Sequence, residues 1–442
     1  MVSNDVRTQQ NIPSLALREH SSISSAPKVS YDVLVLDAYL RQALVSIRSL
    51  GKRGLRIAAL DSNSAVPAFS SRWCQHGFVC PASEATDGYL EYLEQLIELT
   101  GIKVLIPSSD STVALLRQYR KLLEKRVQIA FAKESALELA INKKLTLEIA
   151  SRLGFSVPHG VLVSSIDEVK EAIREVGLPA VVKPVESWVW QNDAGNNIHG
   201  GERIASQLVT TAEEAKLAVE DLTSLGGTTL FQQFLTGRRE AVSFLYANGV
   251  MHARFAQWAK RTEPPLGGQS ILRQSITMPV DIGDQAERLV REIELEGYSE
   301  VEYRRDNEGK PYLMEINPRL SASVEIAVHS GVDFPYLLYQ WANGEQIDQV
   351  ESYHVGNWMR YLKGDIMTTI EAIQQRGRPG VTPPVQSILD FCSSFFIPMR
   401  YDYVDLKDVK PAFIATRDFM SQWIGGAVRK RLPHLQRKTR KP

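Results

Sequence analysis

The chain has 442 residues, enough for two to four domains or one enzyme of several lobes. Lys plus Arg and Asp plus Glu number 51 each, so no net charge draws the protein to nucleic acid. Its three cysteines, Cys74, Cys80 and Cys392, form no C-x-x-C pair, which argues against a disulfide framework or a zinc site. No apolar run reaches membrane-spanning length and no secretion pattern opens the chain, so we expect a cytoplasmic protein.

The first globular segment is expected to be an α/β domain over residues 30–134, after a disordered polar lead-in over 1–29. The pattern predicts strands at 32–38, 55–61, 103–110 and 127–132, and helices at 40–54, 86–100 and 113–124. The first strand–helix turn, after Asp37, has no glycine where a pyrophosphate would approach, so an NAD site is not expected. Residues 107–110 follow a strand, where they either contact an acceptor substrate or merely cap a helix.

Two lysine-bearing elements come next. A helix is expected over residues 135–154, with Lys143 and Lys144 after Asn142. Taken alone, that pair indicates a solvated helix face. The apolar strand 178–184 carries Lys183, whose burial is costly unless its charge meets an anion. The alternative for Lys183 is an edge strand from which its ammonium reaches solvent.

Residues 186–203 have the composition of a glycine-rich loop. Such loops can wrap phosphates with backbone N–H groups and close over them, so a phosphate lid is the hypothesis. Trp188 and Trp190 make this loop bulky, and no single phosphate-binding residue can be assigned in it. A helix is expected over 211–222, opened by a capping box that begins at Thr211.

Strands then flank Gly237, and Asn248-Gly249 predicts a tight hairpin. A loop rich in Pro and Gly follows over residues 260–273. The basic residues of this region are Arg254, Lys260, Arg261 and Arg273. A basic loop suits a carboxylate substrate, and the alternative is a mobile surface loop.

A helix over residues 282–296 leads into the most informative stretch, a hairpin with strands at 300–304 and 311–316. Alternation puts Glu315 and Asn317 on one face, and pairing of the strands would bring Glu302 to them. Two carboxylates and an amide oxygen are ligands that Mg²⁺ accepts alongside nucleotide phosphates. A polar hairpin in an ordinary sheet is the simpler alternative.

The string EINPRLSAS, with Glu302 thirteen positions before Glu315, resembles the ATP-grasp superfamily, whose last core strands carry an acid and then E-x-N-P-R. The resemblance implies a Rossmann-like pre-ATP-grasp α/β domain followed by a two-lobed ATP-grasp α+β module. The implied boundaries are 135–345 for the module, 135–230 for its smaller lobe and lid, 231–345 for its metal-binding lobe, and 346–442 for a C-terminal extension with a basic tail.

The resemblance also implies roles for single residues. Lys143 and Lys183 match the phosphate-binding lysines of the superfamily. The linker that holds adenine and ribose matches Gln232, Gln233, Phe234, Leu235 and Glu240. Here Gln233 replaces the usual hinge acid, and one residue is added before Glu240. The implied metal ligands are Glu302, Glu315 and Asn317, and the candidate catalytic arginines are Arg319 and Arg273.

The implied function is that of an ATP-dependent carboxylate–amine ligase with ATP and Mg²⁺, or Mn²⁺ in its place, as cofactors. A carboxylate becomes an acyl phosphate and an amine then displaces phosphate, with small molecules such as amino acids as substrates. Two alternatives stay open, carboxylation through carboxyphosphate as in biotin carboxylase and a nucleotide-binding regulatory protein without turnover. A homodimer is among the states that relatives adopt.

The last segment, residues 429–442, is rich in Lys and Arg and has no acid. Two interpretations remain open for it. It is either a solvated end or a weak contact with anionic lipid.

Overall fold

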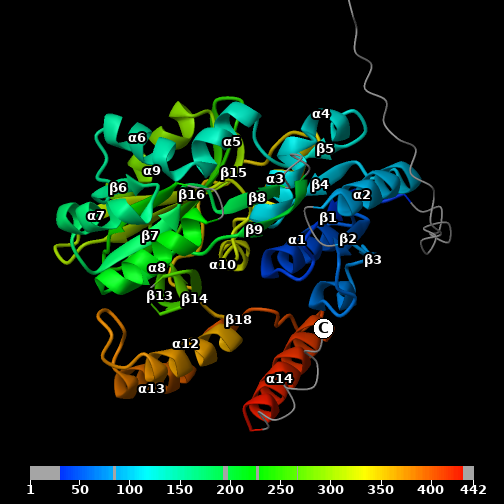
Figure 1. The fold of residues 1–442 in the computed structure, drawn as a ribbon. Helices are drawn as coiled ribbons and strands as arrows, with labels where there is room; N and C mark the ends of the chain where they lie inside the picture. Colours follow the sequence, from blue (N-terminus) through cyan, green and yellow to red (C-terminus); the bar gives the residue numbers. More distant parts are fainter. Residues whose placement is uncertain (1–29, 83–85, 193–197, 225–227, 266, 432–442) are drawn as a thin grey trace, which may run out of the picture.

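The computed structural model describes residues 30–82, 86–192, 198–224, 228–265 and 267–431, without the side chains of 191–192, 198–200 and 424–431 (Figure 1). The expected disordered lead-in and the last part of the basic tail lie outside these residues. Among the described helices, none combines the length and the apolarity that crossing a bilayer requires.

The first domain is built on a parallel sheet with the spatial order β3-β2-β1-β4-β5. Its strands are β1 (Val33–Val35), β2 (Ile57–Asp61), β3 (His76–Val79), β4 (Val104–Ile106) and β5 (Gln128–Ile129). Its helices are α1 (Arg41–Lys52), α2 (Asp87–Thr100), α3 (Asp110–Gln118) and α4 (Arg120–Leu123), with a short 3₁₀ helix, η2, at Pro67–Ser70. The strands β1, β2 and β4 are wholly buried, as their continuous apolar sequences predict.

Two details of this domain differ from the predictions. Strand β3 was not expected, because His76 and Gly77 interrupt its apolar pattern. The helix expected over 113–124 begins earlier, at Asp110, because the Ser109 hydroxyl accepts a hydrogen bond from the Thr112 amide at 3.1 Å. That helix also breaks at Tyr119 into α3 and α4.

A smaller four-stranded antiparallel sheet follows, in the order β10-β7-β11-β6. Its strands are β6 (Gly160–Val163), β7 (Ala180–Pro184), β10 (Gln207–Val209) and β11 (Thr229–Gln233). The helices of this part are α5 (Glu134–Ile141), α6 (Lys143–Arg152), α7 (Val169–Val176) and α8 (Ala212–Thr223), with η3 at Ile166–Glu168. Figure 1 shows α7 and α8 beside this sheet.

The single helix expected over 135–154 is in fact two helices. Asn142 leaves the helical conformation, with φ −79° and ψ 103°, and its side chain accepts a hydrogen bond from the Leu145 amide. Asn142 is therefore the N-cap of α6, and Lys143 is its first residue.

The expected glycine-rich loop is a β-hairpin of β8 (Trp188–Asn192) and β9 (Ile198–Arg203). The loop prediction was wrong, because the described glycine Gly201 does not make the chain irregular. It leaves room for the bulky Trp188 side chain to pack across the hairpin. A Cβ on Gly201 would lie 2.5 Å from the indole of Trp188, so only glycine admits that ring. The tip of the hairpin falls outside the described residues.

The largest sheet has seven strands in the order β16-β15-β12-β13-β14-β17-β18. They are β12 (Arg239–Ala247), β13 (Val250–Glu263), β14 (Gln269–Ser275), β15 (Gly297–Arg305), β16 (Pro311–Asn317), β17 (Trp358–Arg360) and β18 (Arg400–Tyr401). The predicted Asn248-Gly249 hairpin is confirmed, with φ 51° and 77° as a two-residue turn of this kind requires. The adjoining helices are α9 (Val280–Glu292), α10 (Glu325–His329) and α11 (Phe334–Ala342).

Two further predictions need adjustment here. The loop expected over 260–273 is much shorter, because β13 continues to Glu263 and β14 begins at Gln269. Strand β17 pairs with β14, so this part of the expected extension belongs to the large sheet.

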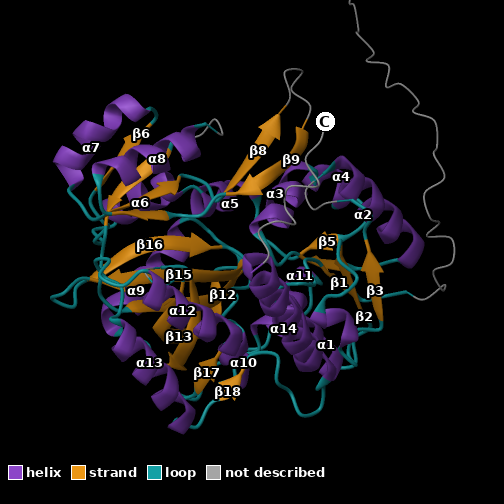
Figure 2. Ribbon diagram, turned by 60° about the horizontal axis from the view of Figure 1, so that its bottom comes forward, coloured by secondary structure: helices purple, strands orange, loops and turns teal. Residues whose placement is uncertain are grey.

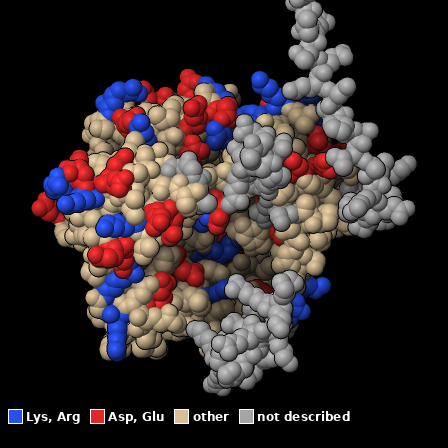
Figure 3. All heavy atoms as spheres, in the orientation of Figure 1, with Lys and Arg blue, Asp and Glu red and all other residues tan. Residues whose placement is uncertain are grey.

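The last helices of the described residues are α12 (Leu362–Gln374), α13 (Pro384–Ser393) and α14 (Lys410–Arg431), with η4 at Ser394–Phe396. All three are on the lower side of the molecule in Figure 1, where α12 and α13 lie side by side, as they also do in Figure 2, and α14 stands apart from them. On the face shown in Figure 3, acidic and basic side chains are interspersed over the lobe that carries α7 and α8.

One apolar core joins the first domain to the large sheet. It contains Leu105 of β4, Leu137 of α5 and Val301 of β15, all buried. These parts of the chain are therefore held as one unit around the site described next.

Candidate active site

The hairpin β15–β16 brings the three predicted metal ligands together. Glu302 lies directly opposite Glu315 in the antiparallel register. The Asn317 Nδ2 donates a hydrogen bond to Glu302 Oε1 at 3.1 Å. Both carboxylates and the amide therefore occupy one face of the hairpin, as the period-two alternation predicted.

Arg239 of β12 holds Glu302 from the other side. Its Nε donates to Glu302 Oε2 at 3.0 Å, and its Nη1 donates to the Ser270 hydroxyl at 2.9 Å. Burial, aided by the charge of nearby Glu315, raises the pKa of Glu302 to about 7 despite this arginine. A site that keeps a carboxylate partly protonated in this way is short of positive charge, and a metal ion would supply it.

Glu315 has the opposite tendency. Burial disfavours its charge, but Lys143 and Lys183 more than offset this and hold the pKa of Glu315 below its ordinary range. The two glutamates thus differ in their protonation although they face each other. Within the described residues no three His, Cys, Asp or Glu side chains converge as a metal site, and the set of two carboxylates with Asn317 stays a prediction.

The two predicted phosphate lysines lie at this face. Lys143, at the start of α6, is buried and donates to the Ser187 hydroxyl at 2.9 Å. Lys183 of β7 is also buried, and burial lowers its pKa to about 8 while Glu315 and Glu302 oppose the change. The edge-strand alternative is excluded, because β7 lies between β10 and β11.

The residues present fit an ATP–Mg²⁺ group, by two observations. The side-chain amide of Gln232 is fully buried, yet neither its Nε2 nor its Oε1 has a hydrogen-bond partner among the described residues. Gln232 lies opposite Val181 and two positions from Leu230, which opposes Lys183, so Gln232 and Lys183 share one face. An unmatched amide beside a desolvated ammonium is suited to a polar, anionic ligand.

The rest of the predicted linker follows Gln232 in order. Gln233 ends β11, Phe234 is half-buried, and the backbone carbonyl of buried Leu235 accepts from Arg304 at 2.9 Å. Glu240 is buried and paired with Arg305 at 2.7 Å and with Arg238 at 2.9 Å. Its ribose role stays a prediction, since both arginines already neutralise it.

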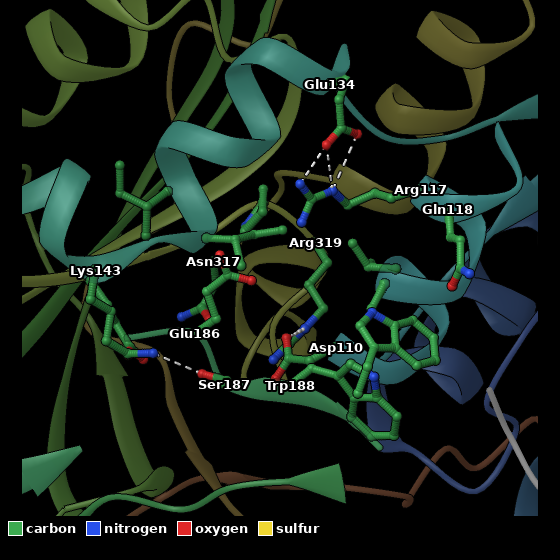
Figure 4. Close-up of a pocket in the computed structure, with 17 residues that line it drawn as sticks. Asp110, Arg117, Gln118, Glu134, Lys143, Glu186, Ser187, Trp188, Asn317 and Arg319 are labelled. Atoms are coloured by element: carbon green, nitrogen blue, oxygen red, sulfur yellow. Dashed lines mark hydrogen bonds and ion pairs between the residues drawn. The ribbon is translucent and has the colours of Figure 1, made fainter. Parts of the chain in front are cut away.

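A cavity of about 390 Å³ opens beside the hairpin (Figure 4). Lys143, Glu315, Asn317 and Arg319 line one part of its wall, and α3 of the first domain lines another. Two side chains from the β8 strand, Trp188 and Trp190, complete it. Three residues of the predicted phosphate and metal site, Lys143, Glu315 and Asn317, thus share this cavity with side chains of α3 and β8.

Arg319 crosses this cavity to the first domain. Its Nε donates to Asp110 Oδ1 at 2.5 Å, and Arg203 donates to Asp110 Oδ2 at 3.2 Å. Burial opposes the charge of Asp110, but the two arginines outweigh it and hold the pKa of Asp110 below its usual range. Residues 107–110 therefore include the N-cap of α3, and Asp110 also lines the cavity, while their contact with an acceptor substrate stays a prediction.

Arg273 is not part of this group. Its guanidinium is fully buried, and its Nη2 donates to Asp402 Oδ1 at 2.6 Å. Two other basic residues of that segment are also engaged elsewhere, Arg254 with Glu287 and Arg261 with Asp365, each at 2.6 Å, while Lys260 is exposed. The basic loop expected to meet a carboxylate is therefore not formed, because strand alternation and ion pairs disperse its charges.

Sequence reasoning missed three contributors, Arg239, Ser187 and Arg117. Arg117 of α3 lines the cavity and donates through Nε to Glu134 Oε1 at 3.0 Å. A signal existed for Arg239, because it directly precedes Glu240, which the linker pattern had already singled out. None existed for Ser187 or Arg117, whose positions depend on how distant elements dock.

Comparison with known proteins identifies the relatives. The family described as "ATP-grasp in the biosynthetic pathway with Ter operon" matches residues 251–364. The carbamoyl phosphate synthase large chain of Thermus thermophilus is 23% identical over 381 residues, covering 82% of this chain and 34% of that protein. A D-alanine–D-alanine ligase of Pseudomonas putida is 24% identical over 195 residues, covering 41% of this chain and 55% of the ligase. The chain thus spans about a third of the synthase chains that it matches.

Solved structures share the fold. Biotin carboxylase of Campylobacter jejuni matches with a TM-score of 0.60 and 14% identity over 74% of each chain. An L-amino acid ligase of Bacillus licheniformis matches with a TM-score of 0.58 and 14% identity, over 75% of this chain and 79% of the other. Together with the E-x-N-P-R motif of the hairpin and the two lysines, these likenesses show that the chain is similar to ATP-grasp proteins over residues 251–364 and shares the fold of the biotin carboxylase and the L-amino acid ligase.

Proposed function

We propose that the protein is an ATP-dependent ligase that activates a carboxylate as an acyl phosphate and joins it to an amine. One observation carries the proposal. A single cavity contains Glu315, Asn317 and Lys143 together with Arg319 and a wall from another domain. Phosphate-facing groups and acceptor-facing groups therefore meet where a transferred phosphoryl group would lie between them.

The chain's own residues have definable tasks in that reaction. When bound, Mg-ATP would supply the phosphoryl group that makes the carboxylate reactive. Glu302, Glu315 and Asn317 would hold the metal ion, and Lys143 and Lys183 would offset phosphate charge. Arg319, fixed by Asp110, presents a guanidinium toward the cavity and would stabilise the charge that develops on the acyl phosphate.

The second half-reaction requires an amine and the exclusion of water. The amine nitrogen attacks the acyl carbon, phosphate leaves with the bonding electron pair, and the nitrogen loses a proton. Trp188 and Trp190 cover the cavity and would keep water from the activated carboxylate. The printed names of two relatives, an L-amino acid ligase and a D-alanine–D-alanine ligase, make an amino acid the first substrate class to test.

The test is Mg²⁺-dependent ADP release against pools of amino acids and small carboxylates, with hydroxylamine present to trap an acyl phosphate. We expect ADP and hydroxamate together, dependent on one pool. Glu315→Gln should lower the rate by at least about 100-fold, because the metal loses one of two carboxylates. Glu308→Gln, an exposed glutamate in the turn of the same hairpin, is the matched control and should leave the rate unchanged.

Two results would overturn the proposal. Wild-type turnover in Glu315→Gln would remove the hairpin from the chemistry. ADP release that requires bicarbonate and yields no hydroxamate would replace the ligase reaction by carboxylation through carboxyphosphate. ATP binding without turnover in any pool would instead support the regulatory alternative.

A further inference from the structure

One face of helix α3 lines the cavity and changes character along its length. The side chains of α3 in the cavity wall come from positions 110, 113, 114, 117 and 118, which is the spacing of a single helical face. Charged Asp110 begins this face, apolar Val113 and Ala114 follow, and polar Arg117 and Gln118 end it. The stretch from Asp110 to Arg117 is about 10 Å long in a helix. A ligand that follows this face would therefore meet a charged group first and an apolar stretch next.

Side chains from two other elements continue the apolar stretch. Trp188 and Trp190 of β8 lie on the same face of the strand, and their rings meet edge to face with centroids 5.8 Å apart. Ile141, the last residue of α5, adds a branched aliphatic group. All three side chains are only partly buried, so they leave apolar surface toward the cavity. Such a wall is suited to a large aliphatic or aromatic group of a ligand.

This apolar wall does not coincide with the site expected for adenine. The linker predicted to hold adenine consists of residues 232–235, and the described lining of the cavity contains none of them. The lining does contain Arg319, which the proposed function places at the acyl phosphate. The apolar wall thus shares the cavity with the reacting carboxylate, where a second substrate would bind.

Most of the charged side chains around the cavity are already neutralised. Asp110 and Arg319 form an ion pair of 2.5 Å, and Arg117 donates through Nε to Glu134 at 3.0 Å. The lysine and the glutamate at the nucleotide end of the cavity would face phosphate and a metal ion in the proposed reaction. These groups therefore leave no charge for the second substrate.

Glu186 differs from the other charged residues of the cavity. It is half-buried, and it makes neither a hydrogen bond nor an ion pair with any of the described residues. Figure 4 shows Glu186 between Lys143 and Arg319. A carboxylate without a counter-charge favours a cation in the space before it. The ammonium form of an amine is such a cation, and the proposed reaction requires an amine.

We propose that the amine substrate enters this cavity as an ammonium ion bound by Glu186, with a large aliphatic or aromatic group packed against Trp188, Trp190 and the middle of α3. The amino acids of this description are those with a branched aliphatic or an aromatic side chain. An amine without such a group would leave the apolar wall in contact with water, so it should bind less well. The inference rests on the proposed ligase function and adds the class of the amine.

The test separates activation of the carboxylate from transfer to the amine. Hydroxylamine is small and largely uncharged near neutral pH, so hydroxamate formation reports the acyl phosphate and depends little on the amine site. Amide formation with L-phenylalanine, L-leucine or glycine, at saturating Mg-ATP and carboxylate, reports the amine site. We expect kcat/KM for L-phenylalanine and L-leucine to exceed that for glycine by at least about tenfold.

Two variants probe the two parts of the amine site. Glu186→Gln keeps the size of the side chain and removes its charge, so kcat/KM for L-phenylalanine should fall at least about tenfold, and much more than hydroxamate formation falls. Ala114→Leu fills the apolar part of the cavity, so the preference for L-phenylalanine over glycine should fall at least about fivefold, because glycine still fits.

Glu213→Gln, at an exposed glutamate of α8, is the matched control and should behave as the wild type does. Glu186 and Ala114 are both partly exposed, so their substitutions should leave the folded state intact. An unchanged circular dichroism spectrum would show this.

The inference fails, with the ligase reaction intact, in either of two cases. One is a kcat/KM for glycine equal to or above that for L-phenylalanine and L-leucine. The other is unchanged amide formation in Glu186→Gln. A wild type that forms no hydroxamate from any carboxylate would count against the proposed function instead. Calorimetric titration of L-phenylalanine and of glycine into the protein with Mg-ADP would then decide, since equal or undetectable affinities would contradict the inference.

Discussion

Lys183 shows at the scale of one residue how burial prepares a group for its ligand. Its neighbours on β7 are apolar, and desolvation lowers its pKa to about 8. A bound anion would reverse that change, because the ammonium would regain a charged partner. The residue is thus least stable as a cation when the nucleotide site is empty.

This pKa gives a pH prediction. A lysine with a lowered pKa loses its proton as pH rises through about 8, so the wild-type affinity for ADP should fall above that pH. Lys183→Arg keeps its charge throughout, so its affinity should stay level up to about pH 9.5. Isothermal titration calorimetry over this range would decide, with Lys144→Arg as control. Parallel pH profiles for the wild type and Lys183→Arg would contradict the prediction.

Asp402 is a second buried charged side chain, and its partners are residues of the protein itself. It is buried and ion-paired with both Arg41 of α1 and Arg273 of β14. Burial disfavours its charge, but the two arginines outweigh this and lower the pKa of Asp402. Its contribution to stability is therefore present above the ordinary aspartate pKa of about 3.9 and is lost as pH falls further.

Asp402→Asn should lower the free energy of unfolding by about 3–5 kcal/mol at neutral pH, because two buried guanidinium groups lose their counter-charge. The variant should also lose part of the decline in stability between pH 5 and about pH 2 that the wild type shows. Urea unfolding at several pH values measures both effects. Asp418→Asn, at an exposed position, should change neither.

The hairpin β15–β16 and Arg273 show what could and what could not be predicted from the sequence for single residues. The proximity of Glu302, Glu315 and Asn317 follows from strand alternation and a short turn, so the sequence was sufficient. The pairing of Arg273 with Asp402 spans 129 positions and depends on how two distant segments dock. No local pattern carries that information.

At the scale of elements, the β8–β9 hairpin shows where composition misleads. Its glycines suggested an irregular loop, but Gly201 is there to admit the Trp188 ring. Helices α5 and α6 show a related error, since an uninterrupted helical composition hid the N-cap at Asn142. The Asn248-Gly249 turn, by contrast, could be predicted from its sequence, because a two-residue hairpin turn of this type requires residues that accept a positive φ.

Gly201→Val tests the hairpin as a lid. The new side chain would displace Trp188 from the cavity wall. The KM for the acceptor should therefore rise about tenfold, which corresponds to a loss of roughly 1.4 kcal/mol of binding free energy. Nucleotide affinity should change little, because Lys183 and Gln232 lie on other strands. Steady-state kinetics with each substrate varied would measure the two effects separately.

Gly267→Ala is the matched control, since a Cβ there meets open space and φ is not in the left-handed region. If Gly201→Val raises the KM for ATP and leaves that for the acceptor unchanged, the hairpin covers the nucleotide and not the acceptor.

At the scale of the whole molecule, the first domain, helices α5 and α6, strand β8 and the large sheet meet at one cavity. Asp110, at the start of α3, and Arg319, two residues after β16, both line this cavity. Their side chains form an ion pair of 2.5 Å. The shared apolar core makes these parts one cooperative unit. Their alternation of strands and helices was predictable, whereas their docking was not, because it depends on contacts between segments far apart in sequence.

Binding across such a unit should stabilise all of it. Mg-ATP at about 100 times its dissociation constant should add about 2.7 kcal/mol, which raises Tm by roughly 3 °C in a chain of this size. Differential scanning fluorimetry would measure the shift. ATP without Mg²⁺ should give a smaller shift, and Glu315→Gln should show no difference between the two conditions. A Mg²⁺-dependent shift retained in that variant would contradict the assignment of the metal ligands.

The contact between Asp110 and Arg319 also bears on how the protein is made. The two side chains are 209 positions apart, so a ribosome must synthesise most of the chain between them before they can meet. A nascent or truncated chain that lacks the β15–β16 hairpin also lacks Glu315 and Arg319 of the cavity wall and both glutamates proposed to bind the metal. In the proposed reaction, an incompletely synthesised chain would therefore be unable to hydrolyse ATP.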